Sequence, residues 1–273
     1  MTDATGRPTL VLGATGSTGR RVAARLRAAG HPVRAASRTA DVRFDWADKS
    51  TWQPAVAGAY GMYLMAPHEL PVDPDFVRCA VDGGVRRMVL LSSMAIEVMG
   101  DERLMAAERV VAESGVDWTI LRPNWFNQNF DEGVFQAAVA AGELAVPLGD
   151  VRQAFVDADD IAAVAVAALT QDGHAGRSYE VTGPEALSFA EALGMIGKAV
   201  GRELTFRGES EDYIATMTAL GLPREQVLAD ARAFEALRAQ GDSTPTDAVR
   251  QVTGRAPKPF QTYVDETHFP SLP

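Results

Sequence analysis

The chain has 273 residues, of which 47% are apolar and 23% charged, so it can bury a substantial core. Its formal net charge of −10 argues against a nucleic-acid partner, because binding to phosphates requires clustered lysine and arginine side chains. Cys79 is the only cysteine, which excludes an internal disulfide and fits a reducing compartment. No leader-like pattern precedes Gly13 and no apolar run is long enough to cross a bilayer, so we expect a cytoplasmic protein without a membrane partner.

Short apolar runs alternate with segments of helical spacing through the first half of the chain. The apolar runs predict strands at 9–12, 31–36, 42–44, 61–65, 87–91 and 118–121. Helices are expected at about 20–29, 50–57, 74–83 and 101–114. This alternation predicts an α/β fold, namely a Rossmann-type doubly wound parallel sheet with helices on both faces.

After Pro123 the alternation loosens, and a smaller mixed part is expected. Helical patterns occupy 131–141, 159–169 and most of 211–252, and a capping box from Ser188 to Glu191 starts a helix that reaches about residue 200. Strands are expected at 178–181 and 202–207, and an irregular end over 256–273. We therefore divide the chain into a Rossmann core (1–150) and a mostly helical C-terminal part (151–273) that completes the sheet and covers the substrate cleft.

Three glycines at 13, 16 and 19 lie between the first strand and the first helix. Gly13 permits the tight turn, Gly16 lets the backbone approach a pyrophosphate, and Gly19 lets the helix pack closely on the strand. The pyrophosphate would lie on the free N–H groups at the helix start. The loop residues expected to bind the dinucleotide are Gly13, Thr15, Gly16, Ser17, Thr18, Gly19 and Arg20.

The end of the second strand distinguishes the two nicotinamide cofactors. An NAD(H) site places an acidic residue there for the ribose 2′-hydroxyl, whereas this chain has Ser37 and Arg38 and no acid before Asp41. Arg38 can bind a 2′-phosphate through its guanidinium, and Arg20 could add a second charge. NADP(H) is therefore favoured over NAD(H); the alternative is that Arg38 is an ordinary solvated surface side chain.

Several segments together resemble the NmrA-like group of atypical short-chain dehydrogenases. The resemblance covers nearly the whole chain and is carried by residues 13–20, 37–38, Asp45, 91–93, 121–130 and 155–162. Within that group, the Leu-Arg-Pro-Asn-Trp-Phe-Asn-Gln-Asn-Phe segment (121–130) is similar to the festuclavine-dehydrogenase-like reductases of natural-product pathways. The resemblance implies adenine contacts from Asp45 and Trp46, ribose and pyrophosphate contacts from Met65, Ala66 and Pro67, and a nicotinamide pocket formed by Ser92, Ser93, Pro123, Asn124, Trp125 and Phe126.

Ordinary short-chain dehydrogenases carry a Tyr-x-x-x-Lys pair on the helix after the fifth strand, and this chain departs from that pattern. The matching positions hold Leu104 and Glu108, and the three lysines, Lys49, Lys198 and Lys258, lie elsewhere. In that pair the lysine lowers the pKa of the tyrosine, which transfers a proton as the hydride moves. The usual proton-transfer machinery is therefore expected to be absent.

Three interpretations of that absence stay open at this point. A reductase could use a substrate electrophilic enough to accept hydride without a strong acid, such as an iminium ion or a quinone-like carbonyl. Another group could move the proton; the candidates are Ser93, His68, Glu108 and Tyr213. Alternatively, the protein catalyses nothing and senses the NADP/NADPH ratio.

An enzyme is favoured over a sensor, on the analogy of the fold. Met94, Trp125 and Phe126 would suit a flat, apolar or aromatic small molecule, although aromatic and methionine side chains often only fill a core. No metal site is predicted, and the sequence alone sets no oligomeric state.

Overall fold

The computed structural model describes residues 6–67 and 70–269. Its main sheet has seven parallel strands in the order β3-β2-β1-β4-β5-β6-β8. The strands are β1 (Thr9–Leu12), β2 (Val33–Ser37), β3 (Val42–Arg43), β4 (Gly61–Met65), β5 (Arg87–Leu91), β6 (Asp117–Pro123) and β8 (Arg177–Val181). Strand order reverses between β1 and β4, which is where doubly wound folds bind ligands. The predicted Rossmann-type α/β fold is confirmed.

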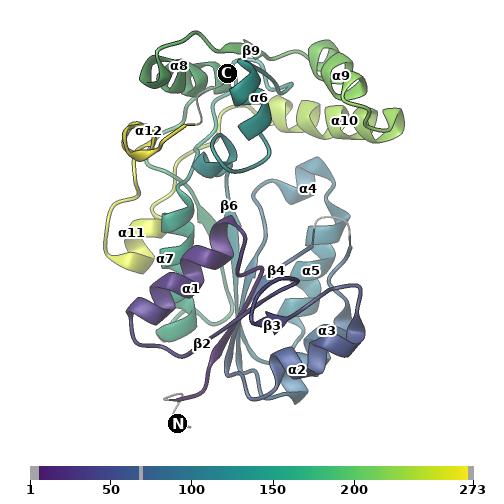
Figure 1. The fold of residues 1–273 in the computed structure, drawn as a ribbon, viewed down its shortest axis with the longest axis vertical. Helices are drawn as coiled ribbons and strands as arrows, with labels where there is room; N and C mark the ends of the chain where they lie inside the picture. Colours follow the sequence, from purple (N-terminus) through teal and green to yellow (C-terminus); the bar gives the residue numbers. More distant parts are fainter. Residues whose placement is uncertain (1–5, 68–69, 270–273) are drawn as a thin grey trace.

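Helices cover both faces of this sheet, because alternate residues of each strand point to opposite sides (Figure 1). Leu10 and Leu12 face one apolar core and Val11 faces the other. On the first side lie α2 (Trp52–Val56), α3 (Pro74–Asp82) and α5 (Glu102–Ala112), with the short helices η1 (Lys49–Thr51) and α4 (Ile96–Met99) nearby. On the second side lie α1 (Ser17–Ala28), α7 (Ala158–Thr170) and α11 (Ala248–Thr253).

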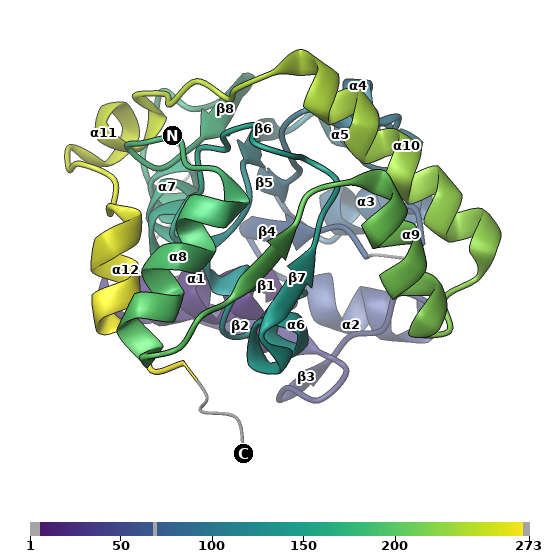
Figure 2. The same cartoon turned by 90° about the horizontal axis from the view of Figure 1, so that it is seen from above.

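A second, smaller part stands above the carboxyl ends of the strands (Figures 1 and 2). Its two-stranded parallel sheet pairs β7 (Glu143–Ala145) with β9 (Thr205–Arg207). Around it lie η2 (Asn127–Asn129), α6 (Gln136–Ala141), α8 (Phe189–Val200), α9 (Ser210–Ala219), α10 (Arg224–Gln240) and α12 (Phe260–Glu266). β7 lies before residue 150 but pairs with β9 in the second part, whereas β8 lies after residue 150 but completes the main sheet. The chain therefore passes between the two parts more than once, and a division at residue 150 stays a prediction.

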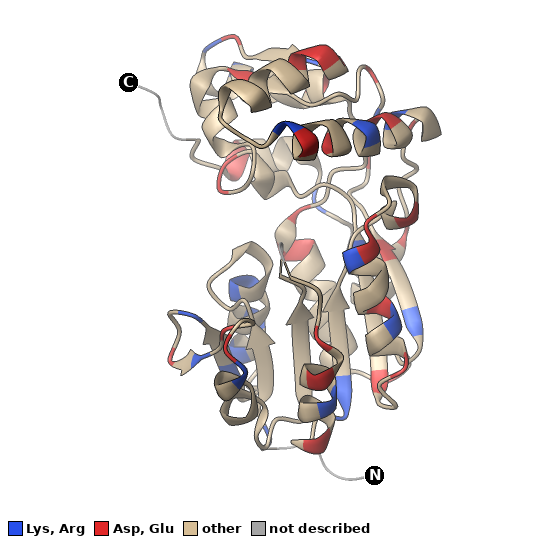
Figure 3. Ribbon diagram, turned by 90° about the vertical axis from the view of Figure 1, so that its right-hand side faces the viewer, with Lys and Arg blue, Asp and Glu red and all other residues tan. Residues whose placement is uncertain are grey.

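The interior of the second part is rich in phenylalanine. Phe130, Phe155, Phe189 and Phe260 are buried and contact one another with ring centroids 5.0–6.1 Å apart. Such aromatic contacts add to the free energy gained from burial. Acidic and basic residues are mixed along the helices of both parts (Figure 3). Among the helices of the described residues, none combines the length and apolar character needed to cross a bilayer.

Most predicted elements are present, with a few corrections. The capping box is confirmed, since the Glu191 N–H donates to the Ser188 hydroxyl and the Ser188 N–H donates to the Glu191 carboxylate. The helix predicted over 131–141 begins only at Gln136, because Gly133 packs against the backbone of Asn129 in a turn. The end predicted to be irregular contains α12, which begins directly after Pro259, a position where the missing N–H of proline costs nothing.

Candidate active site

The glycine loop has the close contacts that its spacing predicts. Gly13 has a φ of 63°, a conformation that favours glycine, and its carbonyl accepts the N–H of Gly16 at 2.8 Å. A Cβ atom on Gly19 would lie 2.2 Å from the Gly13 oxygen, so only glycine lets α1 approach the loop. Gly16 begins α1 without a side-chain cap, which leaves the N–H groups of the first turn available to an anion. Thr18, in that turn, is buried.

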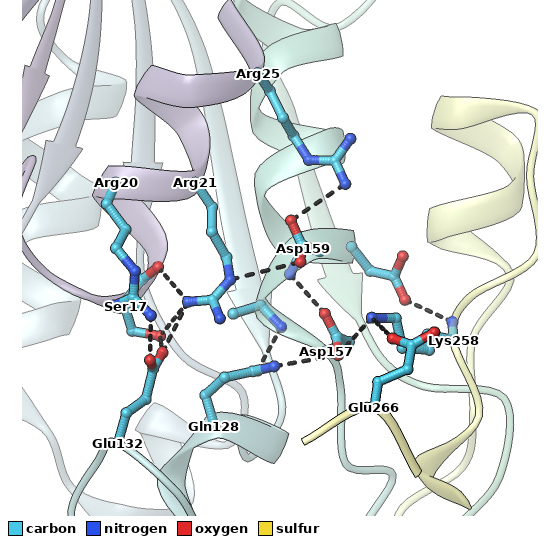
Figure 4. Close-up of polar contacts among 12 residues, drawn as sticks. Ser17, Arg20, Arg21, Arg25, Gln128, Glu132, Asp157, Asp159, Lys258 and Glu266 are labelled. Atoms are coloured by element: carbon cyan, nitrogen blue, oxygen red, sulfur yellow. Dashed lines mark hydrogen bonds and ion pairs between the residues drawn. The ribbon is translucent and has the colours of Figure 1, made fainter. Parts of the chain in front are cut away.

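The first turns of α1 carry a cluster of polar contacts (Figure 4). The Ser17 hydroxyl and the Arg21 guanidinium both donate to Glu132, each at 2.7 Å, and Arg20 pairs with the same carboxylate. Sequence reasoning singled out Ser17 and Arg20 but missed Arg21 and Glu132. Because Arg20 is engaged here, its contribution to a 2′-phosphate stays a prediction.

The residues predicted to bind the adenosine part of the cofactor follow β2 and β3. The Ser37 hydroxyl accepts the N–H of Thr39 at 3.1 Å, and Arg38 is exposed, with no ion pair or hydrogen bond from its side chain to any residue of 6–67 or 70–269. Asp45 accepts the N–H of Ala47 at 3.0 Å. Trp46 packs edge-on against Phe44 and Phe76, with ring centroids 5.0 and 4.9 Å apart. Within the described residues, nothing therefore occupies the Arg38 guanidinium.

The loops after β4, β5 and β6 follow in order along the same edge. Met65 lies against Gly13, and the Pro67 carbonyl, which follows Ala66, accepts a hydrogen bond from Arg103 at 2.7 Å. The Met94 N–H donates to Pro123 at 3.0 Å, which joins the loops after β5 and β6. These are the predicted segments for the ribose, pyrophosphate and nicotinamide. His68 lies outside the described residues.

Backbone strain marks the loop after β5. Ala95, which follows Met94, has a φ of 58° and is the sole non-glycine residue of the described chain in the left-handed region. Such conformations persist where the surrounding structure imposes them, and they cluster at functional sites. The strained residue caps α4, which packs against α10 of the second part.

The two aromatic residues after Pro123 face different parts of the structure. Phe126 packs with the core beneath α1, whereas Trp125 lies in the second part with its ring 5.6 Å from Phe135 and 6.0 Å from Phe234. Asn124 donates from its amide to the Ser243 hydroxyl at 2.8 Å. The contacts of the Trp125 ring are thus with aromatic residues of the second part, and its predicted role beside the nicotinamide stays a prediction.

Within residues 6–67 and 70–269, none of the proposed proton donors has an arrangement like the tyrosine–lysine pair. The carboxylate of Glu108 accepts the Ser92 hydroxyl at 2.5 Å and is ion-paired with Arg122. Leu104, at the tyrosine position, is buried.

The other two described candidates lie apart from that pair. Burial, with Asp230 nearby, raises the pKa of Tyr213 to about 12, and its ring packs on Phe234 in the second part. The Ser93 hydroxyl contacts only the carbonyl of Met94, at 3.3 Å, among the described residues.

A Rossmann sheet with an uncapped glycine loop at its carboxyl edge defines a dinucleotide-binding protein. A family model described as NAD(P)H-binding matches residues 13–172, and the chain belongs to this family.

Named relatives extend the match over nearly the whole chain. It is 34% identical to the "uncharacterized oxidoreductase YesF" of Bacillus subtilis (94% of this chain, 93% of the relative) and 34% identical to a (4-alkanoyl-5-oxo-2,5-dihydrofuran-3-yl)methyl phosphate reductase of Streptomyces griseus (94% and 96%). Festuclavine synthase I of Penicillium roqueforti is 30% identical (94% and 96%), which confirms the resemblance to festuclavine-type reductases. The chain is an NAD(P)-dependent oxidoreductase.

Solved structures agree on the fold. An NADPH-dependent quinone oxidoreductase from Escherichia coli, complexed with NADPH, superposes with a TM-score of 0.78 at 21% identity and covers 94% of this chain and 98% of its own.

Proposed function

We propose that this protein is an NADP(H)-dependent reductase of a flat, apolar or aromatic small molecule that carries a carbonyl, quinone-like or iminium group. The observation that carries the proposal is the placement, along one sheet edge, of the phosphate loop, the free Arg38 and the loops that hold Met94 and Trp125. Doubly wound folds place cofactor and substrate together along such an edge. The relatives named as a furanone phosphate reductase and a festuclavine synthase support a role in natural-product chemistry.

The residues present fit a bound dinucleotide phosphate. The first turn of α1 offers N–H groups without a side-chain cap, Gly16 leaves open the space above them, and Arg38 offers a guanidinium for a 2′-phosphate. When bound, NADPH supplies the hydride. Met65 and Pro67 would border its ribose and pyrophosphate, and Ser92 and Pro123 its nicotinamide.

The proton step needs no strong acid in this proposal. Glu108 is ion-paired with Arg122, and Leu104 has no proton to give. An iminium ion is neutralised by hydride alone, and a quinone-like carbonyl yields an anion that water can protonate. The protein would then contribute mainly orientation, by holding the electrophilic carbon against the nicotinamide.

Steady-state oxidation of NADPH with a panel of quinones, aromatic polyketides and cyclic imines tests the proposal. We expect turnover with at least one class and a clear preference for NADPH over NADH. Tight NADPH binding without turnover on any of the three classes would contradict the proposal and favour a sensor of the NADP/NADPH ratio.

A further inference from the structure

A carboxylate from the segment between η2 and α6, in the second part, lies at the start of α1 (Figure 4). Glu132 follows η2 and accepts hydrogen bonds from Ser17 and Arg21 at 2.7 Å each, and it also pairs with Arg20. Only 24% of its side chain is exposed. The positive end of a helix attracts anions, and this helix end is where the cofactor pyrophosphate is proposed to lie. Glu132 therefore holds donors that an arriving phosphate would also bind.

The segment around Glu132 is anchored independently of this contact. Gln128 donates to Asp157, at the start of α7, at 3.1 Å, and Asp131 accepts the hydroxyl of Tyr263 on α12 at 2.7 Å. These two contacts attach the segment to two other elements. Movement of the Glu132 side chain alone would therefore leave the backbone in place.

The charges of the cluster favour replacement of the Glu132 carboxylate by a phosphate. Three arginines are ion-paired with two carboxylates there, so the cluster has one more cation than anions; its members are Arg20, Arg21, Arg25, Glu132 and Asp159. Burial by itself would raise the pKa of Glu132, but the hydrogen bonds from Ser17, Arg20 and Arg21 outweigh burial and hold the pKa below its ordinary value. Glu132 is thus ionised at neutral pH, and a pyrophosphate beside it would repel it while offering the same donors a stronger partner.

We propose that Glu132 is a positioning residue that competes with the cofactor phosphates for Ser17, Arg20 and Arg21, and that NADP(H) must displace it from these donors in order to bind. The inference rests on the proposed cofactor site. Through two hydrogen bonds and an ion pair, Glu132 fixes the positions of the Ser17, Arg20 and Arg21 side chains. With cofactor bound, its return to these donors competes with the phosphates and favours release of the cofactor.

Titration with NADPH, followed by cofactor fluorescence, tests this competition in three proteins. Glu132→Gln should bind NADPH roughly three- to tenfold more tightly than the unmodified protein at low ionic strength, because one repelling charge is removed. This gain should shrink at high salt. The matched control is Glu143→Gln, which removes the same charge from the ion pair with Arg207 in the second part and should change binding less than about twofold. Adenosine 2′-monophosphate, which has no 5′-phosphate, should bind equally to all three.

A second measurement uses the unmodified protein and does not depend on a variant. Carboxyl-carbon NMR should show the pKa of Glu132 rising when NADPH saturates the site. Unchanged or weaker NADPH binding by a folded Glu132→Gln protein, or a Glu132 pKa that does not move, would overturn the inference while leaving the proposed function intact. An unmodified protein that fails to bind NADPH would overturn both.

Discussion

The carboxylate of Glu108 on α5 is bound by the guanidinium of Arg122 on β6 through two contacts, from Nε at 2.9 Å and from a terminal nitrogen at 2.5 Å. Glu97 contacts the same guanidinium at 2.8 Å. The hydrogen bond with Glu108 is the main reason that the pKa of Arg122 lies above its ordinary value, so this guanidinium stays charged at neutral pH. Glu108, which the sequence comparison predicts to stand at the lysine position of ordinary short-chain dehydrogenases, is therefore an ion-paired acceptor.

Removing the Glu108 carboxylate should affect the chemical step only slightly. We expect Glu108→Gln and Leu104→Ala to keep hydride transfer within about tenfold of the unmodified enzyme, because a true general acid contributes about 10² to 10⁴ in rate. Single-turnover oxidation of NADPH with the best substrate of the panel measures this. A thousandfold loss in Glu108→Gln, with cofactor affinity preserved, would make Glu108 catalytic.

Removing Arg122 instead should damage stability. Arg122→Met leaves Glu108, only 12% exposed, without its partner and should lower the free energy of unfolding by about 3 kcal/mol. Arg43→Met is the control, since its ion pair with Asp48 is exposed and should contribute little. Chemical denaturation measures both. If the two substitutions lowered the free energy of unfolding equally, the Glu108–Arg122 ion pair would contribute no more to stability than an exposed pair.

Cofactor preference should depend on Arg38. We expect NADPH to bind at least about tenfold more tightly than NADH, and Arg38→Ala to remove most of that preference, because a charge-assisted phosphate contact contributes on the order of 1.5–3 kcal/mol. Arg27→Ala, an equal loss of charge at the far end of α1, should leave the preference unchanged. Calorimetry measures the affinities for NADPH and NADH. Equal affinities in the unmodified protein would contradict the proposed preference for NADP(H).

Substitutions at two glycines of the loop should affect cofactor binding and protein stability differently. Gly16→Val should abolish dinucleotide binding with little loss of stability, because φ is −81° and the nearest atom to an added Cβ, the Gly13 oxygen, is 3.3 Å away. Gly19→Ala should destabilise the fold, because its Cβ would lie 2.2 Å from that oxygen. Thermal melts and NADPH titrations of both variants test this. Full NADPH binding by Gly16→Val would place the cofactor elsewhere.

The sequence predicts strands that are short, buried apolar runs, but it does not predict a strand that forms only by pairing with a distant segment. β1, β4 and β5 begin and end at the predicted residues, because each is a short apolar run. β7 was missed, since its three residues pair with β9 about 60 positions later and no local pattern marks it. The same reason applies to the candidate site: the glycine loop is a local signal, whereas the contact from Ser17 to Glu132 spans 115 positions.

Trp125 should matter for turnover more than any of the proposed proton donors. Its ring lies between Phe135 and Phe234, so Trp125→Ala would open the wall that we propose holds the substrate against the nicotinamide. A displacement of about 1 Å can cost about 10² in rate, so we expect at least that loss in single-turnover NADPH oxidation, with NADPH affinity within about threefold. Trp125→Phe, which keeps an aromatic ring, should stay within about tenfold. Because the alanine variant also loses packing, its thermal melt has to show a folded protein at the assay temperature. Turnover within tenfold in a folded Trp125→Ala protein would mean that the ring only fills the core of the second part.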